Sequence, residues 1–300
     1  MKRFTDTLVD RLRRPLHVYR SLRLDMGEVR TLCLTLGPNR NLTTLTASLL
    51  ALHPQCQVLN HAWKRQRGQA EALLSGRDGP AFERFVRAAV ARSQGGRQGR
   101  YGGSVLHSHA FKRPAMREAY ERRYGSSVIK EEIRCVYWKS AKQVTAYVRD
   151  HDIDLAEVAA REPRLRFLMP LRNPLDCALS NYRLGHHSIF GLRDHPVEEV
   201  IDFMTELVGW FLDLRRDHPK SFFGYLEREY DRPMLVRLAS FLELEADETW
   251  IGDCLQSTTR SSPYEYEDAQ LEAYRAALQK HLAGHPEIQG EFAERAGIRL

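Results

Sequence analysis

The sequence of 300 residues predicts an α/β fold in which helices flank a central parallel β-sheet. Short apolar runs recur along the chain, and most of them are apolar at every position, as in strands that are buried on both faces. Longer stretches with helical periodicity separate these runs, which is the alternation typical of parallel sheets. The expected strands are Arg30–Leu36, Gln57–Asn60, Ser104–His107, Arg134–Trp138, Leu165–Leu171 and Phe222–Leu226.

The helical stretches become denser toward the end of the chain, so the C-terminal third is expected to be mainly helical. No shift in composition marks a boundary after residue 25, and residues 26–300 are therefore predicted to form a single domain. The expected helices are Leu42–Leu52, Ala81–Ser93, Ala115–Arg123, Lys142–Asp150, Pro174–Leu184, Val197–Leu214, Pro233–Leu244 and Gln270–Leu282.

Residues 1–25 form a separate basic segment that is amphipathic as a helix, with Phe4, Leu8, Leu12 and Leu16 on one face. It lacks an apolar stretch of the length that a signal peptide or a membrane span requires. Two interpretations remain open: the apolar face packs on the domain, or it contacts an anionic membrane surface.

Composition narrows the class of partner. The chain has 45 basic and 39 acidic residues, a formal net charge of +6. This mild excess suits an anionic ligand such as a nucleotide or a sulfated glycan and gives no support for a nucleic-acid partner. Five scattered cysteines without CxxC spacing predict buried, reduced thiols, a cytoplasmic location and no zinc site.

The segment 36–46, "LGPNRNLTTLT", links an expected strand to an expected helix. Backbone N–H groups at a helix N-terminus attract phosphate, and the hydroxyls of Thr43 and Thr44 with the guanidinium of Arg40 would add donors. The Gly-Lys-Ser/Thr ending of a Walker A loop is missing, which disfavours the usual binding of Mg-ATP.

A second candidate phosphate site follows the strand that ends before Arg172. Asn173 is a favourable N-cap, Pro174 a favourable first helical residue, and Asp176 could complete a capping box. Ser180 lies eight positions after Arg172. Since ligands of open α/β sheets bind at the carboxyl ends of strands, Arg172 is well placed to meet one.

Together the two segments resemble the phosphate-binding motifs of the sulfotransferases, closer to the bacterial and tyrosylprotein-type branch than to the cytosolic branch. The resemblance implies a P-loop nucleotide-kinase-like sheet and 3′-phosphoadenosine-5′-phosphosulfate (PAPS) as sulfuryl donor, without a metal. The 3′-phosphate motif matches Arg172, Asn173, Asp176, Ser180 and Tyr182, and the 5′-phosphosulfate loop matches Arg40, Asn41, Leu42, Thr43 and Thr44.

Leu42 departs from the family pattern, which has glycine at this position. Glycine permits a left-handed backbone and a close approach of phosphate, both of which leucine disfavours. Either the loop follows another path or its affinity for phosphate is reduced. Asn41 tolerates left-handed geometry better than most residues and is the candidate to adopt it instead.

The reaction that the resemblance implies needs a base for the acceptor proton and a cation near the leaving phosphate. His61 occupies the position that holds a catalytic glutamate in tyrosylprotein-type enzymes, and its ordinary pKa of about 6.5 suits proton abstraction. His109 is the alternative base, by its similarity to the Lys-Thr-His stretch of the cytosolic enzymes. Lys139, at the end of a strand, matches the cation. The hydroxyl-rich segment around Arg260 either closes over the nucleotide or is an exposed loop.

The sequence therefore predicts a PAPS-dependent sulfotransferase that acts on a hydroxyl or amine by in-line displacement. One alternative is a non-catalytic protein of the same fold that binds a nucleotide or polyanion, which Leu42 and the absent glutamate favour. A small-molecule kinase is a second alternative. The acceptor is expected to be a small molecule, a glycan or a lipid. The basic segments "WKRQRGQ" and "GHHSIFGLRDHP" are expected to be loops that border the acceptor, and their charge favours an anionic one.

Overall fold

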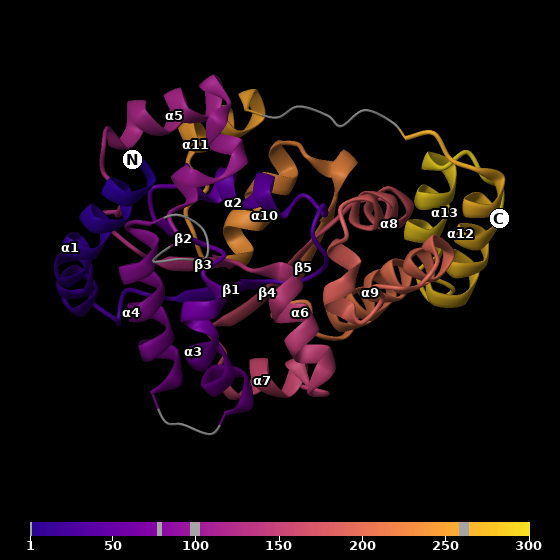
Figure 1. The fold of residues 1–300 in the computed structure, drawn as a ribbon, viewed down its shortest axis with the longest axis horizontal. Helices are drawn as coiled ribbons and strands as arrows, with labels where there is room; N and C mark the ends of the chain where they lie inside the picture. Colours follow the sequence, from indigo (N-terminus) through magenta and orange to yellow (C-terminus); the bar gives the residue numbers. More distant parts are fainter. Residues whose placement is uncertain (1, 77–79, 97–102, 258–263) are drawn as a thin grey trace.

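A computed structural model describes residues 2–76, 80–96, 103–257 and 264–300, with side chains from residue 12 onward. Its centre is a five-stranded sheet with the order β2-β3-β1-β4-β5, in which all neighbouring strands are parallel (Figure 1). The strands are β1 Thr31–Thr35, β2 Cys56–Asn60, β3 Cys135–Lys139, β4 Leu165–Leu171 and β5 Phe222–Leu226. The predicted α/β fold class is therefore confirmed.

The middle strand shows why the runs are apolar throughout. Every residue of β1 is buried, and successive side chains point to opposite faces of the sheet. Leu34 lies beside Trp138 on one neighbouring strand and Phe167 on the other, so one row of large side chains crosses the sheet. Cys33 contributes to the core on the opposite face. Both faces of the sheet are buried from solvent, and for that reason the strands carry few polar residues.

Helices cover both faces of the sheet (Figure 1). In the described ranges the α-helices are α1 Lys2–Leu22, α2 Thr43–Ala51, α3 Trp63–Ser75, α4 Ala81–Ser93, α5 Pro114–Tyr124, α6 Ala141–Asp150, α7 Leu155–Arg161, α8 Pro174–Arg183, α9 Val197–Asp217, α10 Arg232–Phe241, α11 Glu248–Gln256, α12 Asp268–His281 and α13 Pro286–Arg295. Short 3₁₀ turns are η1 Val105–His107, η2 His109–Lys112, η3 His186–Phe190 and η4 Glu227–Glu229.

The core consists of two apolar clusters, one on each side of the sheet. The larger cluster joins the face of Leu34 and Trp138 to α3, α4, α6, α7, α8, α9, α12 and α13. The smaller cluster joins the face of Cys33 and Tyr137 to α2, α5, α10 and α11. All five cysteines are buried and unpaired, as predicted. No helix of the described ranges is both long and apolar enough to span a membrane.

The structure confirms five of the six predicted strands and all eight predicted helices, with ends shifted by a few residues. The strand predicted at Ser104–His107 is wrong, because Val105–His107 coils into the turn η1 and only Ser104 forms a bridge, to Leu59. The segment "WKRQRGQ" was expected as a loop and instead begins α3, which buries Gln66, Ala70, Leu73 and Leu74 at helical spacing.

The topology places the carboxyl ends of all five strands at one edge of the sheet. After β1 the chain continues through α2 to β2 on one side, whereas β4 lies on the other side of β1. The order of the strands thus reverses between β1 and β4, and the loops that leave these two strands diverge. Such a switch point is where open α/β sheets bind ligands.

Candidate functional site

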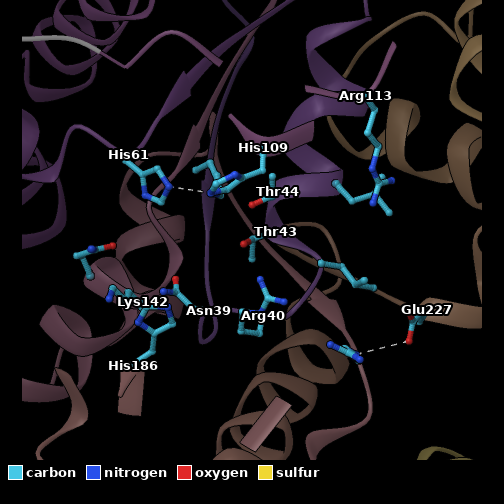
Figure 2. A pocket seen from close by; sticks show the side chains of 15 residues that line it. Asn39, Arg40, Thr43, Thr44, His61, His109, Arg113, Lys142, His186 and Glu227 are labelled. Atoms are coloured by element: carbon cyan, nitrogen blue, oxygen red, sulfur yellow. Dashed lines mark hydrogen bonds and ion pairs between the residues drawn. The ribbon is translucent and has the colours of Figure 1, made fainter. Parts of the chain in front are cut away.

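A polar cavity of about 570 Å³ lies at this edge of the sheet. Figure 2 shows His61, Lys142 and His186 on one side of it and Arg113 and Glu227 on the other, with Arg40, Thr43 and Thr44 between them. The lining residues are Asn39, Arg40, Leu42, Thr43, Thr44, Leu45, His61, His109, Arg113, Lys139, Lys142, Gln143, Arg172, His186 and Glu227.

The loop after β1 enters α2 through an unusual backbone. Leu42 precedes the first helical residue with φ 53° and ψ 4°, in the left-handed region, and Arg40 also has positive φ, 65°. Asn41 does not, so its predicted role as the left-handed residue is wrong. Leu42 itself therefore adopts a conformation that glycine accepts readily and leucine disfavours. This strain costs roughly 1–3 kcal/mol and indicates that the surrounding contacts fix the loop.

Those contacts join the loop to the segment after β4. The amide oxygen of Asn41 accepts a hydrogen bond from the backbone N–H of Arg172 at 2.9 Å. Arg40 Nε donates to Ser180 Oγ at 3.0 Å. The side chain of Asn181 donates to the carbonyl oxygen of Asn39 at 2.7 Å. Three successive loop residues are thus bonded to β4 and α8, and the two predicted phosphate-binding segments form one structure.

Arg172 is held in place, yet its guanidinium keeps a free donor. Its Nη2 lies 3.4 Å from Asp176 Oδ2, and Tyr266 donates to the other oxygen of that carboxylate at 2.7 Å. Glu227 is 3.9 Å from Arg172 Nε, beyond hydrogen-bonding distance. Within the described residues, the buried Nε therefore has no hydrogen-bond partner. A buried donor beside a cavity is a group that an anionic ligand can satisfy.

Of the two capping interactions predicted for the N-terminus of α8, the one from the N-cap forms and the one from the third helical residue does not. Asn173 Oδ1 accepts from the N–H of Leu175 at 2.9 Å, which confirms the cap. The capping box expected from Asp176 does not form, since this carboxylate faces Arg172 and Tyr266. The ring of Tyr264 lies 5.5 Å from the Arg172 guanidinium, so a described part of the C-terminal segment adjoins Arg172. Arg260 lies outside the described residues.

His61 and Lys139 form a contact pair at the ends of β2 and β3. Lys139 Nζ is 2.9 Å from His61 Nε2, and the backbone N–H of His61 donates to the Lys139 carbonyl at 2.7 Å. Burial, together with the charges of Lys139, Lys142 and His109, lowers the pKa of His61 to about 3. Burial lowers the pKa of Lys139 to about 8. The expectation of an ordinary pKa for His61 is therefore wrong, because this imidazole is held neutral beside a cation.

The backbone of His61 is strained as well. Its φ is 59° and that of Ala62 is 63°, two consecutive left-handed residues without glycine. Trp138 Nε1 donates to the His61 carbonyl at 2.5 Å, and Trp138 stacks on Trp63 with ring centroids 5.6 Å apart. The aromatic core thus fixes the turn that directs His61 into the cavity. Strain of this kind tends to occur at functional sites.

The cavity gathers most of the residues that the sequence predicted. Arg40, Thr43, Thr44, His61, His109, Lys139 and Arg172 all line it. Asn41 and Ser180 are buried behind the lining and bond to Arg172 and Arg40. Six further lining residues were not predicted from the sequence: Asn39, Leu45, Arg113, Lys142, Gln143 and Glu227. Glu227 could have been found as the polar residue directly after the predicted strand Phe222–Leu226.

No cluster of His, Cys, Asp and Glu that could hold a metal ion occurs among the residues that the structure describes. No protein-family model and no curated protein matches the chain. Among solved structures, it is similar to a sulfotransferase from Mycobacterium avium, with 14% identity, 93% of this chain and 83% of that chain covered, and a TM-score of 0.44.

A sulfotransferase from Alicyclobacillus acidocaldarius also matches, with 14% identity, 91% of this chain and 98% of that chain covered, and a TM-score of 0.42. The sulfotransferase domain of the Synechococcus PCC 7002 olefin synthase matches with 13% identity, 82% and 93% covered, and a TM-score of 0.39.

The left-handed backbone at residue 42 limits which side chains this position tolerates, and substitutions can test this. Leu42→Val should lower the free energy of unfolding by about 1–2 kcal/mol, because a β-branched residue is strongly disfavoured at this φ. Leu42→Gly should stay within about 1 kcal/mol of the wild type, since relief of strain offsets lost burial and added chain entropy. Denaturant unfolding measures both variants, and a valine variant as stable as the glycine variant would contradict the assignment.

Lys139 is expected to destabilise the fold that contains it. Burial lowers its pKa to about 8, so its charged form, although still the main form at pH 7, is less stable in the folded chain than in the unfolded chain. Lys139→Met should therefore raise the free energy of unfolding at pH 7 by about 1–3 kcal/mol. The same change at the exposed Lys220 is the matched control and should have little effect. A destabilised Lys139→Met protein would show that the ammonium group stabilises the site.

His61 should give the stability a specific dependence on pH. With a folded pKa of about 3, it stays neutral in the folded chain, whereas the unfolded chain takes up this proton below about 6.5. Its contribution is thus present above pH 6.5 and is lost as the pH falls toward 3. The difference in unfolding free energy between wild type and His61→Gln should shift by roughly 2 kcal/mol from pH 6.5 to 5, in favour of the variant. The same substitution at the exposed His107 is the matched control.

Proposed function

We propose that this protein is a sulfotransferase that transfers the sulfuryl group of PAPS to a hydroxyl or amine of an acceptor. The observation that carries the proposal is the junction of two phosphate-binding segments, through Asn41–Arg172 and Arg40–Ser180, beside a buried His–Lys pair. A nucleotide with phosphate groups on both sides of its ribose needs two such segments at a fixed separation. A nucleoside triphosphate needs one.

The residues present fit this nucleotide. The N-terminus of α2 has no side-chain cap, so its first N–H groups can receive an anion. The hydroxyls of Thr43 and Thr44 and the guanidinium of Arg40 border the same space. At the second position Arg172 supplies Nε, which has no hydrogen-bond partner among the described residues. In this assignment Arg40, Thr43 and Thr44 hold the 5′-phosphosulfate, while Arg172 holds the 3′-phosphate and Ser180 positions Arg40.

The donor supplies a sulfuryl group on an activated phosphate, and the chain must provide a base and a cation. Lys139, with a pKa of about 8, is mostly protonated at neutral pH and can donate to an anion in the cavity. Turning toward that anion would withdraw its Nζ from His61 Nε2. This frees the imidazole lone pair and removes a repulsive charge, so the pKa of His61 rises toward the range of an effective base. Binding of the anionic donor would thus activate the base.

His109 is the second candidate base, since it is exposed and lines the same cavity. His61 is preferred because its position is fixed by Trp138 and its lone pair faces the cation that must move. Among the described residues that line the cavity, Glu227 is the only acidic side chain, whereas Lys142, Arg113 and His186 add positive or ionisable groups. This excess favours an anionic acceptor, whether a small molecule, a glycan or a lipid.

Nucleotide binding is the first test. Calorimetry with adenosine 3′,5′-bisphosphate should show binding to the wild type, and Arg172→Ala should weaken it about thirtyfold or more through loss of charge-assisted hydrogen bonds. The exposed Arg216→Ala is the matched control. Absence of binding to the intact protein would reject the proposal, and magnesium-dependent turnover of ATP would favour a kinase.

Transfer is tested with a labelled PAPS donor against a panel of anionic and neutral acceptors. His61→Ala should abolish transfer while it retains affinity for adenosine 3′,5′-bisphosphate, because His61 acts on the acceptor proton. His109→Ala should remain active. The reverse result would assign the base to His109, and nucleotide binding without transfer to any acceptor would identify a non-catalytic protein.

A further inference from the structure

Helix α1 turns its apolar face away from the protein. Leu12 is 72% exposed, Leu16 46%, Tyr19 53% and Leu22 61%. Most lie three or four residues apart and therefore share one stripe of the helix. Large apolar side chains exposed singly are ordinary, but a row of them on one helix face marks an interaction surface. The expectation that this face packs on the domain is wrong for the residues whose side chains are described.

The opposite, polar face attaches the helix to the domain. His17 and Ser21 are buried, four residues apart, against α4. Gln94 Nε2 donates to the His17 carbonyl at 3.1 Å. Arg87 Nη1 donates to the carbonyl oxygens of Ser21 at 2.7 Å and Leu22 at 2.8 Å, which satisfies the C-terminus of the helix. The exposed stripe is thus held outward by specific bonds at the last turns of α1.

The charge of the chain is concentrated in the same helix. The sequence of α1 contains six basic and two acidic residues, a net charge of +4 out of +6 for the whole chain. Arg13 and Arg20 are exposed beside the apolar stripe, and Arg23 follows the helix with its guanidinium 5.3 Å from the ring of Tyr19. Leucines and a tyrosine bordered by arginines are the composition of helices that lie in a membrane interface.

We propose that α1 is a membrane-binding helix that lies flat on an anionic phospholipid surface, with Leu12, Leu16, Tyr19 and Leu22 in the interface and the arginines at the headgroups. Its length of roughly 30 Å would lie parallel to the surface. The charge favours lipid over a second copy of the chain, because two α1 helices packed by this stripe would bring like charges together. An anionic lipid surface complements both the apolar stripe and its basic borders.

Vesicle co-sedimentation of the full chain tests this proposal. The protein should pellet with vesicles of roughly two parts phosphatidylcholine to one part phosphatidylserine, much less with phosphatidylcholine alone, and less as salt is added. Leu12→Ser/Leu16→Ser should reduce partitioning about tenfold or more, and Arg13→Gln/Arg20→Gln should reduce it on the anionic vesicles only. Val236→Ser/Leu255→Ser changes two exposed apolar residues of α10 and α11 and should leave partitioning unchanged.

Because Leu12 and Leu16 are exposed, the double serine variant should keep the thermal midpoint and the nucleotide affinity of the wild type. Wild-type protein that stays in the supernatant with both kinds of vesicle would overturn the proposal, as would a double serine variant that pellets like the wild type. Light scattering that shows a dimer without lipid, lost in the same variant, would assign the stripe to a second copy and would also overturn it.

Discussion

The hydrogen bond from the Arg172 backbone to the Asn41 side chain is the contact on which the site depends. It joins the loops that leave β1 and β4, at the point where the strand order reverses and the loops would otherwise separate. With it in place, Arg40 reaches Ser180 and Asn39 reaches Asn181, so the loop can hold two left-handed residues. The hydrogen bonds of Arg40 with Ser180 and of Asn39 with Asn181 add to its support of the strained entry to α2.

On the other side of the cavity, a strained turn is likewise held by a hydrogen bond from a distant residue. His61 and Ala62 are left-handed without glycine, and this turn is fixed by a hydrogen bond from Trp138, whose ring is buried among Trp63 and Phe85. On both sides of the site, therefore, a strained loop is held by hydrogen bonds to residues at the ends of buried strands. Strain and a buried ammonium group reduce stability, and the two apolar clusters of the core offset that cost.

The sequence was sufficient for the sheet because strands buried on both faces differ sharply from amphipathic helices. It failed at Ser104–His107, where a short apolar run formed the turn η1, and at α3, where dense charge and Gly68 concealed the helical spacing. The site residues followed strand ends, a rule that found Arg172 and Lys139 and would have found Glu227. It could not predict the Asn41–Arg172 bond, which spans 131 residues, or that Ser180 bonds to Arg40 instead of lining the cavity.

The pKa of His61 could not be predicted from the sequence either, because it depends on burial and on the charges of Lys139, Lys142 and His109, which come from two other parts of the chain. In the proposed mechanism, the effect of Lys139 on the pKa of His61 gives a reason for the base and the cation to be neighbours. An imidazole with a pKa of about 3 is a weak base, and a lysine with a pKa of about 8 loses its proton more easily than an ordinary lysine. His61 is therefore poorly suited to act as a base while Lys139 faces it. In the proposed mechanism, an anion that draws the ammonium group away from His61 removes one of the charges that lower the pKa of this imidazole, so that His61 becomes a better base once the donor is bound.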